Sequence, residues 1–272
     1  NKTVITKYNN PEKLLTDYYE GMVLGEIWGY RIDGLFASDE EATEYTSKIN
    51  QDFVNARILS DKVEPYYRAG DLKFRDLDGD NIISKGDDTA YDAGDREIIG
   101  NETPRYNYSF RLGADWNGFD LGIFFQGVGK RDWYPNYLST GFWGPYSRAF
   151  TSFIPANFMD QCWSEENPGG YFPRFRGYQT FKDSQLGVNN DRYLQDASYI
   201  RLKNLTVGYT LPVLKKVFTK LRVYFTGENL WYWSPMKKYT KYIDPEAAGG
   251  NGNTGMAYNY SRNFSVGVDI TF

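Results

Sequence analysis

The sequence contains no histidine and only one cysteine, Cys162, among its 272 residues. Without histidine the chain lacks the usual general base and the commonest metal ligand, so Ser-His-Asp, Cys-His and zinc-histidine sites are excluded within it. One cysteine excludes an intramolecular disulfide and a paired-cysteine metal site. The net charge of −4 argues against an electrostatic nucleic-acid binder. No apolar run approaches the roughly 18 residues of a membrane helix, and the polar start does not predict a signal peptide.

Aromatic residues and glycine are abundant, whereas helical patterning is rare. The chain has 24 Tyr, 18 Phe, 7 Trp and 27 Gly, too many aromatic residues for a disordered chain. Several segments alternate apolar and polar residues with the period of a β-strand. These segments are residues 106–116, 119–126, 196–211, 221–231 and 260–272. Asn117 and Gly118 form a two-residue hairpin signal, and a phase slip near Lys203 predicts a β-bulge. The pattern predicts an all-β fold.

The connections between these segments differ in length. Turns at 117–118 and 212–220 are short, whereas the segments 37–104, 130–191 and 234–259 are long. Because successive strands alternate in direction, all short turns fall at one end and all long loops at the other. Outer-membrane barrels have this layout, with short periplasmic turns and long extracellular loops, and it would place the C-terminus in the periplasm. A soluble secreted β-sandwich, such as a carbohydrate-binding module with a structural calcium, is the alternative.

The N-terminal part of the chain is less regular. Residues 27–36 are expected to form a strand, and residues 4–8 the end of another, which gives about seven strands in all. Ser38 and Glu41 resemble a helix capping box, with a helix expected through about Asn55. Bacterial barrels need at least eight strands. We therefore expect residues 1–272 to be the C-terminal part of a larger antiparallel β-barrel, whose missing strands lie upstream or on another chain.

An acidic stretch resembles a twelve-residue calcium loop. Its candidate ligands are Asp76, Asp78, Asp80, Ile82 through its carbonyl, Ser84 and Asp87. Position six of the loop is Asn81 rather than Gly, although Asn tolerates the left-handed conformation. Position twelve is the short Asp87 rather than a bidentate Glu. The two interpretations are a structural Ca²⁺ site that rigidifies the loop and a turn rich in Asp and Asn.

Other candidate residues follow from strand phase and from aromatic content. The residues expected to face a polar barrel lumen include Arg111, Asp115, Gln126, Arg222 and Glu228. The long loop after residue 130 carries aromatic residues that could bind a sugar or a protein partner, or could pack the loop itself. The candidates there are Trp133, Trp143, Tyr146 and Trp163.

Paired carboxylates raise the possibility of a glycosidase. The pairs are Asp244 with Glu246, Glu165 with Glu166, and Asp87 with Asp88. All lie in expected loops, and nothing in the sequence places a pair across a cleft. We expect a non-enzyme.

Six short motifs, in order, resemble one known family. They occupy residues 25–36, 69–80, 95–100, 119–127, 163–168 and 199–209, followed by the alternating final strand that ends at Phe272. Each motif is weak alone, but their order and spacing resemble the C-terminal portion of a SusC-family TonB-dependent outer-membrane transporter of Bacteroidetes. The match spans almost the whole chain.

This resemblance implies a barrel of 22 strands in outer-membrane lipid, closed by a plug domain. It also implies a SusD-like surface lipoprotein as partner and energy delivered through TonB by a part of the protein outside this sequence. The implied cargo is an oligosaccharide, with peptide as the second class, and the loops would be extracellular.

Overall fold

The computed structural model describes residues 1–55, 67–148, 154–175, 185–212, 219–248 and 259–272. The chain divides into two compact units. The first unit comprises Asn1–Thr103, Asp132–Gln195 and Ala247–Ala257, and the second comprises Pro104–Arg131, Asp196–Glu246 and Tyr258–Phe272. Among the described residues, no helix has the length and apolar character needed to cross a membrane.

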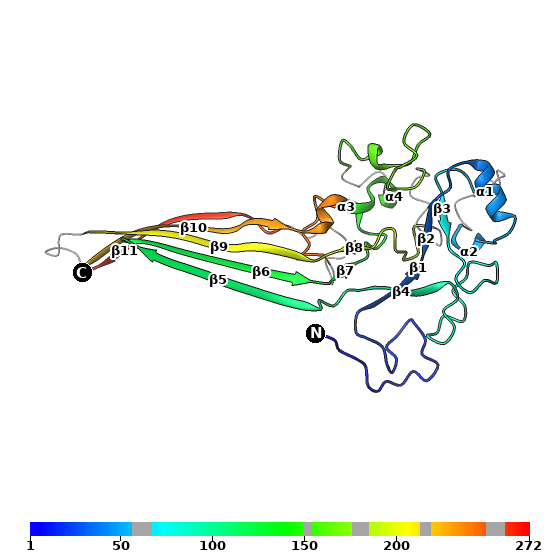
Figure 1. The fold of residues 1–272 in the computed structure, drawn as a ribbon, viewed down its shortest axis with the longest axis horizontal. Helices are drawn as coiled ribbons and strands as arrows, with labels where there is room; N and C mark the ends of the chain where they lie inside the picture. The colour runs from blue at the N-terminus through cyan, green and yellow to red at the C-terminus, as the bar shows by residue number, and fades with distance from the viewer. Residues whose placement is uncertain (56–66, 149–153, 176–184, 213–218, 249–258) are drawn as a thin grey trace. The chain divides into compact units, whose positions relative to one another are not determined.

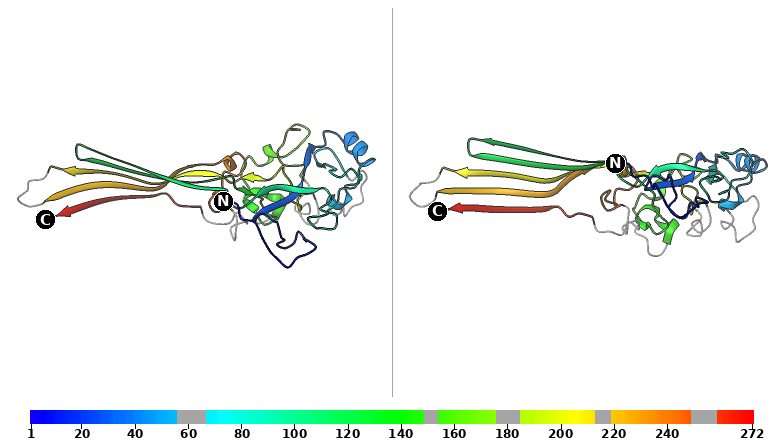
Figure 2. Two further views of the ribbon diagram at one scale, coloured as in Figure 1. Left: turned by 60° about the horizontal axis from the view of Figure 1, so that its bottom comes forward. Right: turned by 90° about the horizontal axis from the view of Figure 1, so that it is seen from below.

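A five-stranded antiparallel sheet forms most of the second unit (Figures 1 and 2). Its spatial order is β11-β10-β9-β6-β5. The strands are β5 (Tyr106–Trp116), β6 (Phe119–Gly129), β9 (Tyr199–Leu211), β10 (Lys220–Trp233) and β11 (Asn263–Thr271). These five strands were all expected from sequence alternation, and the all-β prediction is confirmed.

The turn and the bulge expected in this sheet are both present. Asn117 and Gly118 join β5 to β6 with φ values of 48° and 85°, and a type I′ hairpin turn requires positive φ at both positions. On β9, Asn204 pairs with Phe124 and Leu202 pairs with Phe125, so Lys203 is the extra residue of a bulge. The bulge shifts the alternation by one residue and keeps each face of the strand uniform on both sides of it.

The sheet has one apolar and one polar face, as the register between its strands shows. One row of directly opposed residues reads Ala114, Leu121, Val207, Phe225 and Val266. The next row, on the other face, reads Gly113, Gly122, Thr206, Thr226 and Ser265. The apolar side chains are exposed, including those of Leu112, Val207 and Val266, the last at 76%. A water-soluble sheet would normally cover such a face.

Two of the seven segments expected in the barrel lie outside this sheet. Residues 27–36 form two short strands, β1 (Glu26–Tyr30) and β2 (Ile32–Leu35), which pair with β4 (Arg96–Asn101) and β3 (Leu72–Phe74) respectively. Residues 4–8 contribute only an isolated bridge from Val4 to Val23. The expectation was wrong because alternation identifies a strand but does not identify the sheet that it joins.

The first unit contains short helices and small two-stranded sheets. Helix α1 (Asp39–Thr46) begins at the expected cap, where Ser38 Oγ accepts a hydrogen bond from Glu41 N at 3.1 Å. The expected helix through Asn55 is instead interrupted, and a separate turn, α2 (Asp52–Asn55), follows. The remaining elements are α3 (Thr140–Trp143), α4 (Pro145–Arg148), η1 (Met159–Gln161) and the pair β7 (Asp132–Trp133) and β8 (Gln195–Asp196). In the second unit, η3 (Pro235–Lys238) follows β10.

Parts of the three expected loop ranges lie outside the described residues, namely 56–66, 149–153, 176–184 and 249–258. Most of 37–104 and of 130–191 belongs to the first unit. These ranges are therefore long segments with their own short elements rather than simple turns.

Candidate functional site

The five residues expected to face the lumen share the polar face of the sheet. Arg111 lies in one row with Phe124, Asn204 and Glu228. Asp115 lies opposite Asp120, and Gln126 lies opposite Arg201. Arg222 lies opposite Thr210 and Asp269. Their common face agrees with the phase read from the sequence, and their role in lining a lumen stays a prediction.

Arg222 joins three strands across the polar face. Its Nε donates to Asp120 Oδ2 at 2.8 Å, its Nη2 donates to Asp120 Oδ1 at 2.6 Å, and its Nη1 donates to Asp269 Oδ2 at 2.9 Å. Asp120 belongs to β6, so the guanidinium of β10 must pass over β9 to reach it. Gly208 makes this possible, since a Cβ atom there would lie 2.3 Å from Asp120 Oδ2. Gly208 was not predicted to matter from the sequence, although a glycine in the interior of a strand can indicate that another group approaches the backbone closely.

The acidic loop brings together three carboxylates, and one oxygen atom of each lies within 4.8 Å of one oxygen atom of the other two. They belong to Asp76, Asp78 and Asp95. Asp76 accepts hydrogen bonds from the backbone N–H groups of Gly79 and Asn81, and Asn81 has the left-handed φ of 67° anticipated for position six. Asp95 was missed because it lies eight residues beyond the twelve-residue pattern.

Two other predicted ligands accept hydrogen bonds from backbone N–H groups within the loop. Asp80 accepts a hydrogen bond from Ile82 N at 2.6 Å, and Ser84 Oγ accepts one from Gly86 N at 3.1 Å. Asp80 and Asp87 are not members of the close carboxylate group among the described residues. The six-residue set stays a prediction, and the structure adds Asp95 to its two leading members.

Asp95 is the buried member of the group. Its Oδ1 accepts from Leu77 N and its Oδ2 accepts from Ser84 N, each at 2.7 Å, and its side chain is fully buried. Burial raises the pKa of Asp95, and the negative charges of Asp78 and Asp76 raise it further, whereas the two backbone hydrogen bonds oppose this shift. A cation among these three carboxylates would offset the repulsion.

The four aromatic candidates for sugar or partner binding are buried. Trp133, Trp143, Tyr146 and Trp163 have exposed fractions of 2, 0, 0 and 6%. The rings of Trp133 and Trp143 contact Phe142 at centroid distances of 6.3 and 4.6 Å. These residues leave little ring surface for a ligand, so their burial favours the packing role over direct contact.

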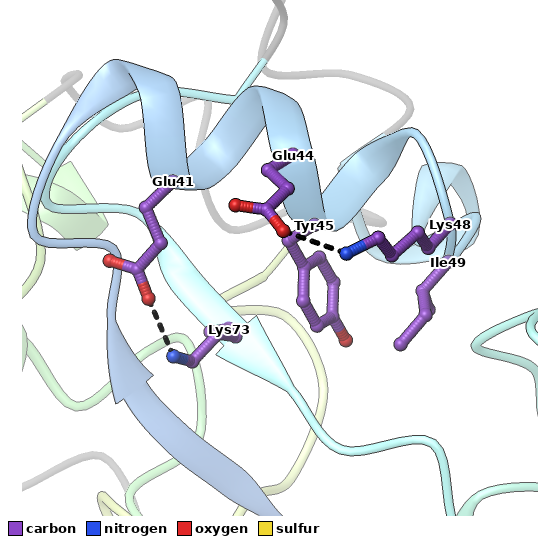
Figure 3. A pocket seen from close by; sticks show the side chains of 6 residues that line it. All are labelled: Glu41, Glu44, Tyr45, Lys48, Ile49 and Lys73. Carbon is purple, nitrogen blue, oxygen red and sulfur yellow. Dashed lines mark hydrogen bonds and ion pairs between the residues drawn. The ribbon is translucent and has the colours of Figure 1, made fainter.

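A shallow surface pocket of about 250 Å³ lies beside α1 (Figure 3). It is lined by Glu41, Glu44, Tyr45, Lys48, Ile49 and Lys73. Glu41 pairs with Lys73 and Glu44 pairs with Lys48, each at 2.7 Å. Because the lining charges pair with one another, the pocket exerts little net electrostatic attraction on a charged ligand.

The paired carboxylates considered for glycoside hydrolysis have structural partners or lie in solvent. Asp244 is 2% exposed and pairs with Arg201. Asp88 pairs with Arg96 at 2.7 Å, and Glu165 is exposed. None of these pairs is arranged as an acid and a base across a cleft among the described residues.

No family model matches the chain. Individual proteins that resemble it identify its family. The chain is 30% identical over 217 residues to TonB-dependent receptor P26 of Formosa agariphila, covering 75% of this chain and 20% of that protein. It is 29% identical over 269 residues to TonB-dependent receptor P3 of the same organism, covering 93% of this chain and 22% of that protein. The chain thus spans about a fifth of the length of these relatives.

Solved structures show the same fold. The RagAB peptide transporter superposes with a TM-score of 0.59 at 20% identity, over 98% of this chain and 24% of that chain. The RagAB peptide importer in its open-open state gives a TM-score of 0.54 at 20% identity, over 93% of this chain and 23% of that chain. The five-stranded sheet therefore corresponds to part of a receptor barrel wall. Its sequence relatives and its fold agree, and the chain belongs to the TonB-dependent receptors.

Proposed function

We propose that this chain supplies barrel wall and extracellular loops to an outer-membrane nutrient importer of the SusC/SusD type. The observation that carries the proposal is the two-faced sheet, with an exposed apolar face and an opposite face of mostly polar and small residues. Lipid would cover the apolar face, and the polar face would meet the lumen. The relatives named as TonB-dependent receptors support energisation through TonB. The lipoprotein partner is the one that the resemblance to SusC implies.

The cargo has two candidate classes in this proposal. An oligosaccharide follows from the resemblance to SusC, and a peptide follows from the cargo named for RagAB. The alternative of a soluble β-sandwich is disfavoured by the exposed face of the sheet, since a sandwich buries that face against a second sheet.

Spin labels on neighbouring positions of β11 test the placement in the membrane. Val266 and Ser265 are adjacent, and their side chains lie on opposite faces. In the receptor within outer-membrane vesicles, a label at Val266→Cys should be relaxed by oxygen, which dissolves in lipid, and shielded from a water-soluble nickel chelate. A label at Ser265→Cys should lack this oxygen preference. Native Cys162 is buried and should contribute little background. Equal accessibility of both positions, or extraction of the protein without detergent, would refute the barrel placement.

Uptake by whole cells tests the cargo. Cells with and without the gene are offered labelled oligosaccharides and labelled peptides of similar mass. We expect gene-dependent uptake of one class, abolished by a protonophore that collapses the inner-membrane gradient. Gene-dependent uptake that survives the protonophore would contradict energisation through TonB, and uptake of neither class would contradict both cargo assignments.

We also propose that the acidic loop holds a structural Ca²⁺ through Asp76, Asp78 and Asp95. Three carboxylates with oxygen-only donors suit this hard cation. Terbium, which replaces calcium and is excited through nearby aromatic rings, provides the assay. Asp78→Asn should weaken terbium binding at least tenfold, whereas Asp87→Asn, outside the close group, should leave it nearly unchanged. Equal effects of the two substitutions would contradict a site formed by the close carboxylate group without Asp87.

A further inference from the structure

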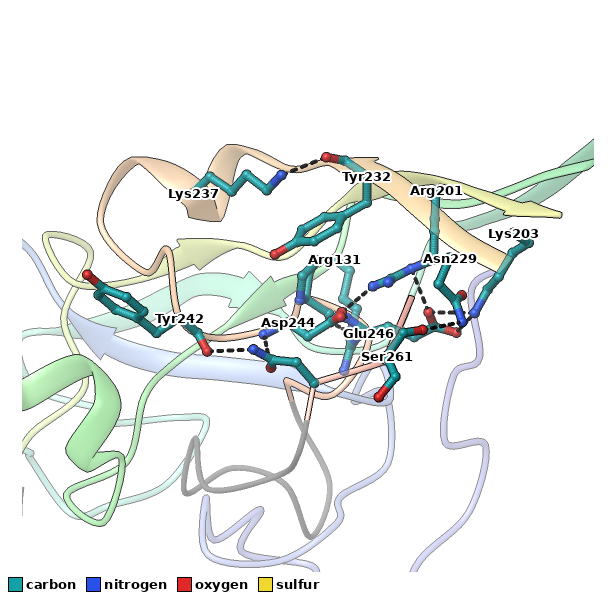
Figure 4. Close-up of polar contacts among 12 residues, drawn as sticks. Arg131, Arg201, Lys203, Asn229, Tyr232, Lys237, Tyr242, Asp244, Glu246 and Ser261 are labelled. Carbon is teal, nitrogen blue, oxygen red and sulfur yellow. Dashed lines mark hydrogen bonds and ion pairs between the residues drawn. The ribbon is translucent and has the colours of Figure 1, made fainter. Parts of the chain in front are cut away.

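A group of charges, with Arg201 and Asp244 fully buried, lies on the polar face of the sheet near the start of β9 (Figure 4). Arg201, 1% exposed, donates from Nη2 to Asp244 Oδ1, and its Nε lies 3.1 Å from Glu246 Oε2 in an ion pair without hydrogen-bond geometry. Lys203 Nζ donates to both oxygens of Glu246 at 2.9 and 2.8 Å. Both carboxylates belong to the segment after η3, so two residues of β9 hold two residues of a loop.

Aromatic rings complete this arrangement. The guanidinium of Arg201 lies 4.7 Å from the centroid of Tyr232 and 5.1 Å from that of Tyr260. Lys203 Nζ lies 4.6 Å from the Tyr260 centroid, and Lys237 Nζ lies 3.7 Å from the Tyr232 centroid. Cations and rings thus alternate from η3 through β10 and β9 to the residues before β11. Such contacts are strongest where water is excluded, as it is around Arg201.

The same loop segment is held at further points. Arg131 Nη1 donates to Pro245 O at 3.0 Å, and Asn259 Oδ1 accepts from Asp244 N at 3.2 Å. The Asn259 amide also donates to Tyr242 O at 3.1 Å. Residues 234–246 are therefore fixed to Arg131, just after β6, to the first residues of β9, and to Asn259, the first residue of the described segment 259–272.

Burial of these charges is weak evidence for stability, because two desolvated ions recover little net free energy when they pair. Their value is positional, since a fully buried ion pair has few acceptable geometries, and a shifted loop would leave Asp244 unpaired in a dry site. An apolar contact would tolerate sliding, whereas this one does not.

We propose that Arg201 is a positioning residue whose charge-paired cluster holds residues 234–246 in one place on the polar face of the sheet. In the proposed function the polar face of the sheet meets the barrel lumen. The anchored segment then forms a rigid part of the wall of the cargo path, and this assignment rests on the proposed function. The cluster is defined by Arg201, Lys203, Tyr232, Asp244, Glu246 and Tyr260.

Hydrogen exchange in the detergent-purified receptor tests the anchor. Arg201→Met alone leaves the buried Asp244 carboxylate without its ion-pair partner. The informative variant therefore combines Arg201→Met with Asp244→Asn and Glu246→Gln, which removes both carboxylate charges as well. The amides of Thr240 and Ile243, which donate to Met236 O and Thr240 O, should exchange at least tenfold faster in this variant. Amides in the middle of β9 and β10 should not change. The single variant Arg201→Lys keeps the positive charge, so the amides of Thr240 and Ile243 should keep part of the protection that the triple variant loses.

Arg222→Met is the matched control, because Arg222 also pairs with two carboxylates of the same sheet but contacts none of residues 234–246. It should leave exchange at Thr240 unchanged. Unchanged exchange in the triple variant, or an equal effect of Arg222→Met, would overturn the anchor.

Uptake separates the two parts of the proposal. The triple variant should raise the apparent KM for cargo severalfold with a smaller change in maximal rate. Faster exchange with unaltered uptake would overturn the assignment to the cargo path. If the unmodified receptor imports nothing in this assay, the proposed function fails, and the exchange result still decides whether Arg201 anchors the loop.

Discussion

Replacement of Gly208 by alanine should break the polar bridge across the sheet. The new Cβ atom would lie 2.3 Å from Asp120 Oδ2 and 2.6 Å from both Nε and Nη2 of Arg222. Non-bonded heavy atoms prefer separations of roughly 3.5 Å, so an overlap of about 1 Å must be relieved. The strand itself is held by β6 and β10 on both sides, and the side chains of the ion pair are therefore the parts that move.

The expected cost is the loss of the two hydrogen bonds between Arg222 and Asp120. Bonds to charged groups contribute roughly 1.5–3 kcal/mol when well shielded. The side chains of Arg222 and Asp120 retain exposed fractions of 18% and 26%. Water therefore weakens the interaction, and we take its free-energy contribution to lie near the lower end of this range. We expect Gly208→Ala to lower the free energy of unfolding by about 2 kcal/mol, or roughly thirtyfold in the folding equilibrium.

Gly122→Ala provides the matched control, since it lies on the same polar face and its nearest atom would be Thr206 Cβ at 4.0 Å. Its effect should stay within about 0.5 kcal/mol. In an Asp120→Ala background, Gly208→Ala should cost much less than in the native receptor, because the clashing carboxylate is gone and Arg222 can turn toward Asp269. Urea titration of the purified receptor, followed by tryptophan fluorescence and heat-modifiable gel migration, measures the four variants and the native receptor. Equal stability of the two alanine variants would refute the close approach over Gly208.

Three further predictions concern the first unit. Phe142→Ala should destabilise it by about 4 kcal/mol, because the ring is 2% exposed and its removal leaves a cavity; limited proteolysis that is unchanged would contradict this. Asn81→Ala should cost about 1 kcal/mol at its left-handed φ of 67°, whereas Asn81→Gly should be neutral, as judged by thermal unfolding in calcium-free buffer. Because burial raises the pKa of Asp95, the folded loop binds its proton more tightly than the unfolded chain does. In calcium-free buffer, protection of the Leu77 and Ser84 amides, corrected for intrinsic exchange, should therefore fall as pH rises above about 4; a rise would contradict the burial argument.

The local chemistry of the sheet could be predicted because it depends on neighbours in sequence. Alternation identified the five strands and their two faces, and the sequence Asn117-Gly118 predicted the hairpin with positive φ at both residues. The bulge at Lys203 was visible as a phase slip. The cap at Ser38 was equally local, since its acceptor and donor lie three residues apart.

Contacts between distant residues could not be predicted in this way. Arg222 meets Asp120, 102 positions away, and Arg201 meets Asp244, 43 positions away. The loop carboxylates therefore looked like solvated charges, although Asp244 is buried. The aromatic candidates looked suited to a ligand, although the loop uses them as its own core.

The sequence by itself determined the strands, their faces, the tight turn and the resemblance to TonB-dependent receptors, because these properties reside in residue spacing along one chain. Only the tertiary structure decided which strands share the long sheet, which carboxylates approach one another and which charges are buried. Strand pairing and side-chain burial depend on contacts between residues that are far apart in the sequence. Local periodicity identifies a strand and its faces but does not specify these distant partners.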